Sequence, residues 1–111
     1  MDFLLPSWIE LKQPFDRDFQ TVIEKSVDKG EASAIALAVE LNDYLLIIDD
    51  LKGRNFALQL GLTIIGTMGV IVDAKLTRVI SSVKPLLAKI KATNFRISEN
   101  VEILILNKAG E

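Results

Sequence analysis

Two continuous apolar runs constrain the fold of this chain more than any other feature. Residues 44–49 read YLLIID and residues 62–66 read LTIIG, and in neither run do apolar and polar residues alternate regularly. Such runs are typical of strands covered on both faces, as in parallel sheets. Between them, residues 50–61 have the character of a helix that Gly61 closes. Strand, helix and strand in this order predict an α/β fold with right-handed crossovers that place helices on the sheet faces.

Helical patterns dominate the rest of the chain. Pro14 is suited to opening a helix with an apolar face as far as Val27, which Gly30 would close. A second helix is expected from Glu31 to Leu41, with alanines at positions 32, 34, 36 and 38 that let another backbone approach closely. Further predicted elements are an edge strand at residues 8–11, helices at 67–80, 81–93 and 98–108, and an extended segment at 95–98. The length of 111 residues favours a single domain.

Composition limits the chemistry that this chain can perform. It has no cysteine and no histidine, which excludes disulfides, thiolate zinc sites and catalytic triads with an imidazole base. Any bound metal must be held by oxygen atoms, which favours Mg²⁺, Mn²⁺ or Ca²⁺. No apolar run approaches the roughly 18 residues of a membrane span, and the N-terminus lacks a signal-peptide pattern, so a cytoplasmic protein is expected.

Charge is distributed unevenly along the chain. Residues 1–50 contain eleven acidic and four basic residues, whereas residues 51–111 contain nine basic and four acidic residues. Between Asp73 and Glu99 there is no acidic residue but six basic ones. This pattern fits a metal site beside a phosphate-binding surface, and it equally fits two solvated faces that attract each other.

Acidic residues are expected to meet at the carboxyl end of the predicted sheet. The first apolar run ends in Asp49 and Asp50, and the second ends just before Thr67. Glu31 begins the helix that leads to the first run, so antiparallel packing would bring it to the same edge, where open α/β sheets bind ligands. Paired carboxylates there suit a hard cation that activates water. The alternative is a purely structural role at helix ends. Glu31 would then stabilise its own helix by about 0.3–1 kcal/mol through the helix dipole, and one of the aspartates would cap the next helix.

The segments that carry these residues resemble PIN-like proteins, relatives of the toxin ribonucleases of VapC type. The resemblance covers nearly the whole chain and rests on GEASAIALAVE, LLIIDDLKGRNFALQLGLTIIGTMGV, AKL and the closing FRISENVE and AGE. It implies a three-layer α/β sandwich with a short parallel sheet and an acidic cluster that binds Mg²⁺ or Mn²⁺ and cleaves RNA. Carried over, the catalytic and metal-binding candidates are Glu31 with Asp49 or Asp50, and the substrate-binding candidates are Lys52, Arg54 and Thr67.

This sequence departs from the family pattern at its start. Family members begin with a hydrophobic strand that ends in the central metal-binding aspartate, whereas here Asp2 follows Met1 directly, and Asp16 and Asp18 lie in a helical pattern. Leu51 stands where the family usually has arginine. We therefore expect an N-terminally truncated, incomplete PIN-like domain over residues 1–111 that lacks the first central strand, binds Mg²⁺ or Mn²⁺ weakly and has little or no activity.

Two classes of function follow from this comparison. The first is a metal-dependent single-strand endoribonuclease of a toxin–antitoxin system, with RNA as substrate and an antitoxin protein as partner. The second is a catalytically inactive module that self-associates or binds protein or nucleic acid, which the missing first aspartate favours. Residues 103–106 are four consecutive apolar residues, more than one helix face buries, and a missing strand leaves unpaired edges. A homodimer or higher homo-oligomer is therefore expected, with residues 103–106 in its interface.

Overall fold

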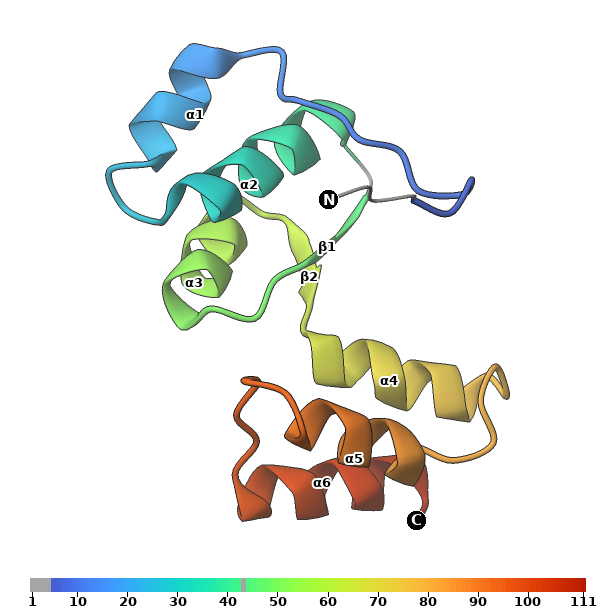
Figure 1. The fold of residues 1–111 in the computed structure, drawn as a ribbon. Coiled ribbons are helices and arrows are strands. Elements are labelled where there is room, and N and C mark those ends of the chain that lie inside the picture. The colour runs from blue at the N-terminus through green and yellow to red at the C-terminus, as the bar shows by residue number, and fades with distance from the viewer. Residues whose placement is uncertain (1–4, 43) are drawn as a thin grey trace. The chain divides into compact units, whose positions relative to one another are not determined.

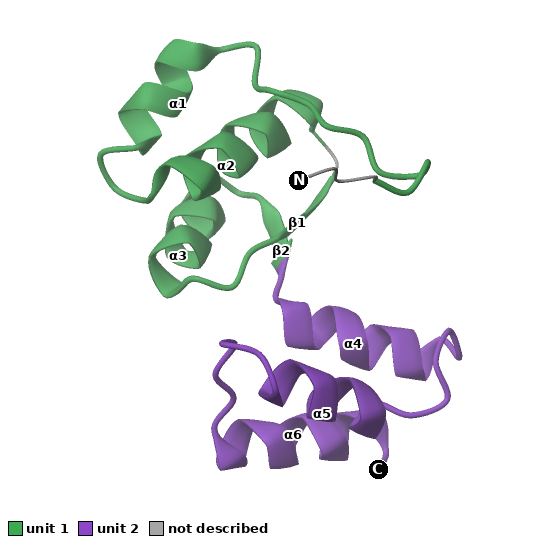
Figure 2. Cartoon of the chain, viewed as in Figure 1, with its two compact units in different colours: residues 1–64 green, residues 65–111 purple. Residues whose placement is uncertain are grey.

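A computed structural model describes residues 5–42 and 44–111 of the chain, which divides into two compact units, residues 1–64 and 65–111 (Figure 2). Each unit has its own hydrophobic core. Asp2 lies outside the described residues, so the expectation that the first metal-binding aspartate and its strand are missing stays a prediction. That the whole chain forms one incomplete PIN-like domain stays a prediction.

The first unit contains a small α/β arrangement. Its elements are α1 (Arg17–Ile23), α2 (Lys29–Leu41), β1 (Leu45–Ile47), α3 (Leu51–Gln59) and β2 (Thr63–Ile65), whose last residue already belongs to the second unit (Figure 1). The two strands form a parallel sheet, and α3 is the crossover between them. The predicted α/β class with a short parallel sheet is therefore confirmed.

Helix α2 is the centre of the first core. It contacts α1, α3 and β1, and Ala32, Ile35 and Ala36 are completely buried. Two of the alanines predicted to allow close approach, Ala32 and Ala36, thus lie fully buried in the core of this unit. The small side chains bring these elements near α2, so the starts of α2 and α3 lie close together.

Local capping explains why the first helix is shorter than predicted. Asp16 caps α1 by accepting a hydrogen bond from the Phe19 N–H at 3.0 Å, and the Glu40 carboxylate accepts from the N–H groups of Phe15 and Asp16. These bonds hold the backbone before Arg17 outside the helix, so Pro14 does not open it. The predicted helix closure at Gly30 is also wrong, because Asp28 caps α2 and Gly30 lies in the first turn of that helix.

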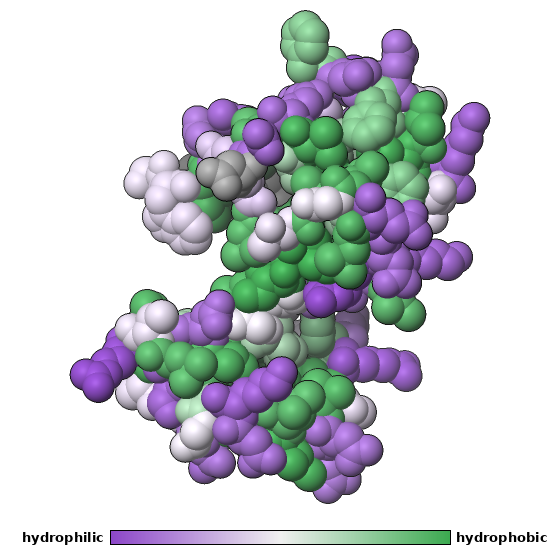
Figure 3. Space-filling view, turned by 180° about the vertical axis from the view of Figure 1, so that it is seen from behind, coloured by the Kyte–Doolittle hydropathy of each residue, from purple (hydrophilic) through white to green (hydrophobic). Residues whose placement is uncertain are grey.

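The strand β1 differs from the expectation of a strand buried on both faces. Leu46 is 8% exposed, whereas Leu45 and Ile47 are 54% and 56% exposed. The two-stranded sheet is covered on the face toward its helices, and the alternate side chains reach the surface. Large hydrophobic side chains are exposed on both units, as the green areas of Figure 3 show. The edge strand predicted at residues 8–11 does not form.

The second unit is helical apart from the end of β2. It contains α4 (Thr67–Leu76), α5 (Lys84–Lys91) and α6 (Glu99–Ala109), and its core is formed by Ile71, Val72, Val83, Leu87, Ile105 and Ala109. Ser98 caps α6 and Pro85 lies in the first turn of α5, both as predicted. Among the described residues no helix is both long and apolar enough to cross a membrane.

The Glu111 carboxylate joins the ends of the helices in this unit. It accepts hydrogen bonds from the Ser82 hydroxyl and from the Val83 N–H, and Lys75 Nζ lies 3.6 Å away. These donors lower the pKa of Glu111, with the Ser82 bond as the largest cause. Ser82 is therefore engaged with Glu111, and Val83 rather than Ser81 or Ser82 is the residue that precedes α5.

One buried polar side chain in α1 leads to a stability prediction. Gln20 is 5% exposed, and its Oε1 atom has no hydrogen-bond partner among the described residues. Burying such an atom without a partner costs about 1–3 kcal/mol, so Gln20→Met should raise the free energy of unfolding by about 1 kcal/mol. Urea unfolding measures this, with the exposed Gln59→Met as the matched control. A less stable Gln20→Met protein would show that the amide makes a bond in solution.

Candidate acidic site

The start of α2 positions Glu31 through local capping. The Asp28 carboxylate accepts a hydrogen bond from the Glu31 N–H at 2.8 Å, and Glu31 interacts in return with the backbone of Asp28. This reciprocal arrangement is a capping box, with an N-cap acceptor and a glutamate three residues later. The helix-end role considered for Glu31 is therefore present, and it also holds the carboxylate in one place.

The start of α3 lies against Glu31. Asp50 caps α3, with its Oδ2 accepting from the Gly53 N–H at 3.1 Å. A β-carbon added at Gly53 would lie 2.6 Å from Ile48 Cδ1 and 3.1 Å from Glu31 Oε2. The absence of a side chain at Gly53 thus leaves room for the Glu31 carboxylate beside the first turn of α3.

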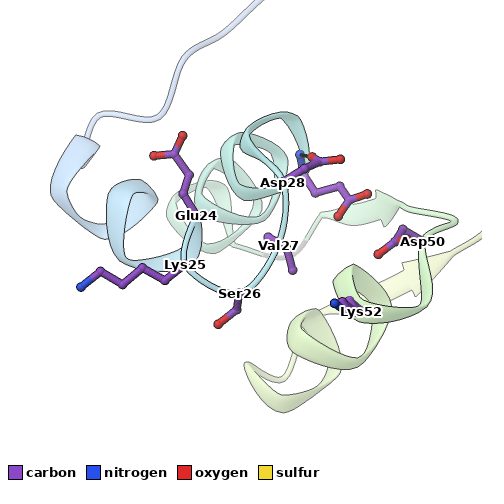
Figure 4. Close-up of a pocket in the computed structure, with 8 residues that line it drawn as sticks. Glu24, Lys25, Ser26, Val27, Asp28, Asp50 and Lys52 are labelled. Atoms are coloured by element: carbon purple, nitrogen blue, oxygen red, sulfur yellow. Dashed lines mark hydrogen bonds between the residues drawn. The ribbon is translucent and has the colours of Figure 1, made fainter.

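A pocket of about 340 Å³ opens where these helix starts meet (Figure 4). Its lining residues are Glu24, Lys25, Ser26, Val27, Asp28, Glu31, Asp50 and Lys52. Figure 4 shows Lys25 extending away from Asp28 and Asp50, and the Glu24 carboxylate pointing away from both. Four of the lining residues are acidic and two are basic, so negative charge accumulates in the lining.

The pKa of Glu31 reports this accumulation. Partial burial raises the pKa above 4.5, and the negative charges of Asp28 and Asp50 raise it further. A hydrogen bond with the Asp28 backbone acts in the opposite direction but does not outweigh them. A carboxylate in this state gains from taking up a proton or a cation.

Three of the predicted site residues line this pocket. Glu31 and Asp50 come from the starts of α2 and α3, and Lys52 lies in the first turn of α3. Asp49 does not line the pocket. Of the two aspartates that sequence reasoning left open, Asp50 is thus the one whose charge acts on Glu31.

The other two predicted substrate-binding residues are Arg54 and Thr67. Arg54 Nη1 donates a hydrogen bond to the Ile48 carbonyl at 2.9 Å, so its guanidinium links α3 to the segment after β1. Thr67 is the first residue of α4 in the second unit. Its predicted convergence with Glu31 stays a prediction.

The connection between α1 and α2 contributes pocket residues that sequence reasoning missed, among them Glu24 and Asp28. For Asp28 a signal was present, because Asp followed three residues later by Glu marks a capping box. For Glu24 no local signal exists, because its place depends on how the chain turns after α1. Carboxylates from separate elements meet only through tertiary packing.

The donor atoms fit a hard divalent cation in kind, since Mg²⁺ and Mn²⁺ prefer carboxylate oxygens. Asp50 accepts its capping bond through Oδ2, whereas Asp28 also shares a side-chain hydrogen bond with Glu31. Within the described part of the chain, however, no three acidic residues are close enough together to hold a metal ion. A metal-binding role for Glu31 and Asp50 therefore stays a prediction.

Comparison with known families agrees with the resemblance found in the sequence. The family model described as PIN domain matches residues 2–111. No match was found among curated proteins or among solved structures. PIN domains are nuclease-like proteins that generally use divalent metal ions. Because the match covers almost the entire chain, this protein belongs to the PIN domain family.

Proposed function

We propose that the protein is a Mg²⁺- or Mn²⁺-dependent endoribonuclease of single-stranded RNA, related to the toxins of toxin–antitoxin systems and weak in activity. The observation that supports this most is the meeting of Glu31 and Asp50 in one pocket, where burial and neighbouring charge raise the pKa of Glu31. Such a perturbed carboxylate in a pocket is typical of functional sites. An antitoxin protein is the proposed partner.

The roles in this proposal follow from the geometry. Glu31 and Asp50 would bind the cation through the oxygens that capping leaves available, and Lys52 on the pocket wall would attract the RNA phosphate. When bound, the metal supplies an activated water and neutralises phosphate charge. With two direct carboxylate ligands, the expected affinity is about millimolar, as in the weaker calcium-binding modules.

The second candidate function is a binding module without catalysis. It is favoured because no three acids of the described chain form a metal cluster. The second unit offers basic residues for a nucleic-acid backbone. Lys75 and Lys91 are paired with Glu111 and Glu102, whereas Lys84 and Lys89 on α5 make no ion pair with the described residues. In the other form of this second candidate function, the inactive module binds a second copy of itself.

Cleavage of single-stranded RNA in the presence of Mn²⁺ tests the first candidate. The wild-type protein should cleave slowly, and Asp50→Asn should lower the rate at least about tenfold because a metal ligand is lost. Asparagine caps helices as well as aspartate does, so the fold should be retained. The matched control is Asp49→Asn, which changes the same charge outside the pocket and should cleave like the wild type.

The outcomes separate the two candidates. Equal activity of Asp50→Asn and wild type would show that this pocket is not the nuclease site. Wild-type protein that binds RNA without cleaving it, with an affinity that falls steeply as salt rises, would support the binding module instead.

A further inference from the structure

The second unit contains a single aromatic residue, Phe95, and holds it at the surface. Phe95 lies in the connection between α5 and α6 and is 39% exposed. The core of this unit is formed entirely by aliphatic side chains, and Ile97, two residues after Phe95, packs against it. The only aromatic ring of the unit is therefore placed where a ligand can reach it.

Hydrogen bonds fix the backbone that carries Phe95. The Thr93 hydroxyl donates to the Ile90 carbonyl at 2.6 Å, and the Phe95 N–H donates to the same hydroxyl at 3.2 Å. The Thr93 N–H donates to the Ile90 carbonyl as well, at 3.0 Å. One threonine side chain thus joins the end of α5 to the turn that follows. The position of Phe95 is set before a ligand binds, which lowers the entropy lost on binding.

The exposed side of α5, which leads to this turn, consists of small and basic residues. Its small residues form a strip along the helix, made up of Pro85, Ala88 and Ala92. Helical geometry places a lysine border on each side of this α5 strip, with Lys84 and Lys91 on one side and Lys89 on the other. Lys84 and Lys91 are two turns apart, about 10 Å along the helix. Both line a hollow of about 330 Å³ beside the strip.

The basic residues around the α5 strip are only partly neutralised. Lys91 Nζ lies 2.9 Å from Glu102 Oε2. No ion pair with a described residue is formed by the other three bases, Lys84, Lys89 and Arg96. The helix itself has no acidic residue, and the acids that follow it lie in the first turn of α6, where they offset the helix dipole. The strip therefore has a positive potential, which favours a polyanion.

We propose that single-stranded RNA lies along the α5 strip, with its phosphates between the bordering lysines and an unpaired base stacked on Phe95. The small residues let the RNA backbone approach the helix closely, and lysines on both borders meet phosphate oxygens from two sides. Arg96, beside the ring, adds a guanidinium that binds phosphate or stacks on a base. An aromatic ring next to basic residues suits unpaired strands, because every base has a face that can stack.

This inference rests on the proposed function, because it names the surface that would hold the RNA. It uses none of the residues that line the acidic pocket. A duplex would meet the same lysines, but its bases are already paired and stacked, so Phe95 would gain no contact. An acidic polypeptide would also be attracted by the lysines, and it has no bases at all. The response of each ligand to loss of the ring therefore distinguishes the three.

Fluorescence anisotropy of a labelled single-stranded RNA, with EDTA present to prevent cleavage, tests the stacking. Phe95→Leu keeps an apolar side chain but removes the ring, and it should weaken binding about tenfold. The same variant should bind a duplex of equal length as tightly as the wild type does. Phe15→Leu is the matched control, since it removes a ring that is 93% exposed in the first unit, and it should bind the single strand like the wild type.

Replacing lysines tests the backbone contacts. Lys84→Gln and Lys89→Gln should each weaken binding of the single strand. Each should also reduce the slope of log affinity against log salt concentration by about 0.7, as expected when one phosphate contact with a single strand is lost. Lys12→Gln, at an exposed position in the first unit, should change neither quantity. Circular dichroism checks that the helices remain in all variants.

Three results would overturn the proposal. They are a wild-type protein that does not bind single-stranded RNA, a Phe95→Leu protein that loses single strand and duplex equally, and polyglutamate that binds as tightly as the RNA and loses as much with Phe95→Leu. The nuclease proposal fails separately. Slow cleavage that depends on Asp50, together with binding that Phe95→Leu leaves unchanged, would refute the RNA surface alone. Binding as expected without any cleavage would support the RNA surface and contradict the nuclease.

Discussion

Replacing Ile105 with aspartate should unfold the second unit, whereas the same substitution at the adjacent Leu104 should leave it folded. Ile105 is 4% exposed and belongs to the core cluster with Val72, Val83 and Leu87, while Leu104 is 51% exposed. A carboxylate at position 105 would have no partner, and burying it should cost more than about 4 kcal/mol, a large part of the stability of a small protein.

Hydrogen exchange of backbone amides in residues 67–109 measures this difference. The Ile105→Asp protein should exchange rapidly in all three helices, and the Leu104→Asp protein should keep the protection of the wild type. Preserved protection in Ile105→Asp would contradict the core described here. The interface role expected for residues 103–106 stays a prediction.

Replacing Glu31 with glutamine should make the protein more stable and its metal binding weaker. The pKa of Glu31 is raised in the folded protein, first by burial and then by Asp28 and Asp50, so the folded state holds this proton more tightly than the unfolded state does. The wild type therefore loses stability as pH rises from 4.5 through the folded pKa. Glutamine carries no charge and is compatible with the capping box.

Thermal unfolding at two pH values and titration with Mn²⁺ measure the two effects. Glu31→Gln should melt at a higher temperature than the wild type at pH 7, and the difference should disappear at pH 3, where Glu31 is protonated in both states. The affinity for Mn²⁺ should fall at least about tenfold, because one of two carboxylate ligands is lost. Asp49→Asn is the control. Unchanged Mn²⁺ affinity in Glu31→Gln would exclude this residue as a ligand.

Several local features of the fold are legible in the sequence. Ser98 precedes α6, Pro85 lies in the first turn of α5, and Gly61 follows α3 with a φ of 79°. Each of these residues acts through its own backbone or a neighbour three or four positions away, so its effect is local and its pattern is recognisable. The order of helix, strand, helix and strand follows from such signals together with the apolar runs.

The sequence was less informative where an outcome depends on distant contacts. The length of α1 depends on Glu40, which is 24 and 25 residues away from the N–H groups it accepts from. The exposure of Leu45 and Ile47 depends on which face of the sheet the helices cover. Continuous hydrophobicity cannot distinguish a strand covered on two faces from one covered on a single face.

The candidate site shows the same division. The sequence alone limited the chemistry open to the candidate site, because a chain without histidine or cysteine has only oxygen ligands to offer a metal, and it placed Glu31 and the two aspartates at the starts of helices. Only the tertiary structure decided that Asp50, not Asp49, shares a pocket with Glu31, and that Asp28 and Glu24 join them. The reason is physical: capping is settled within one turn of a helix, whereas the repulsion that raises the pKa of Glu31 depends on how closely α2 and α3 pack.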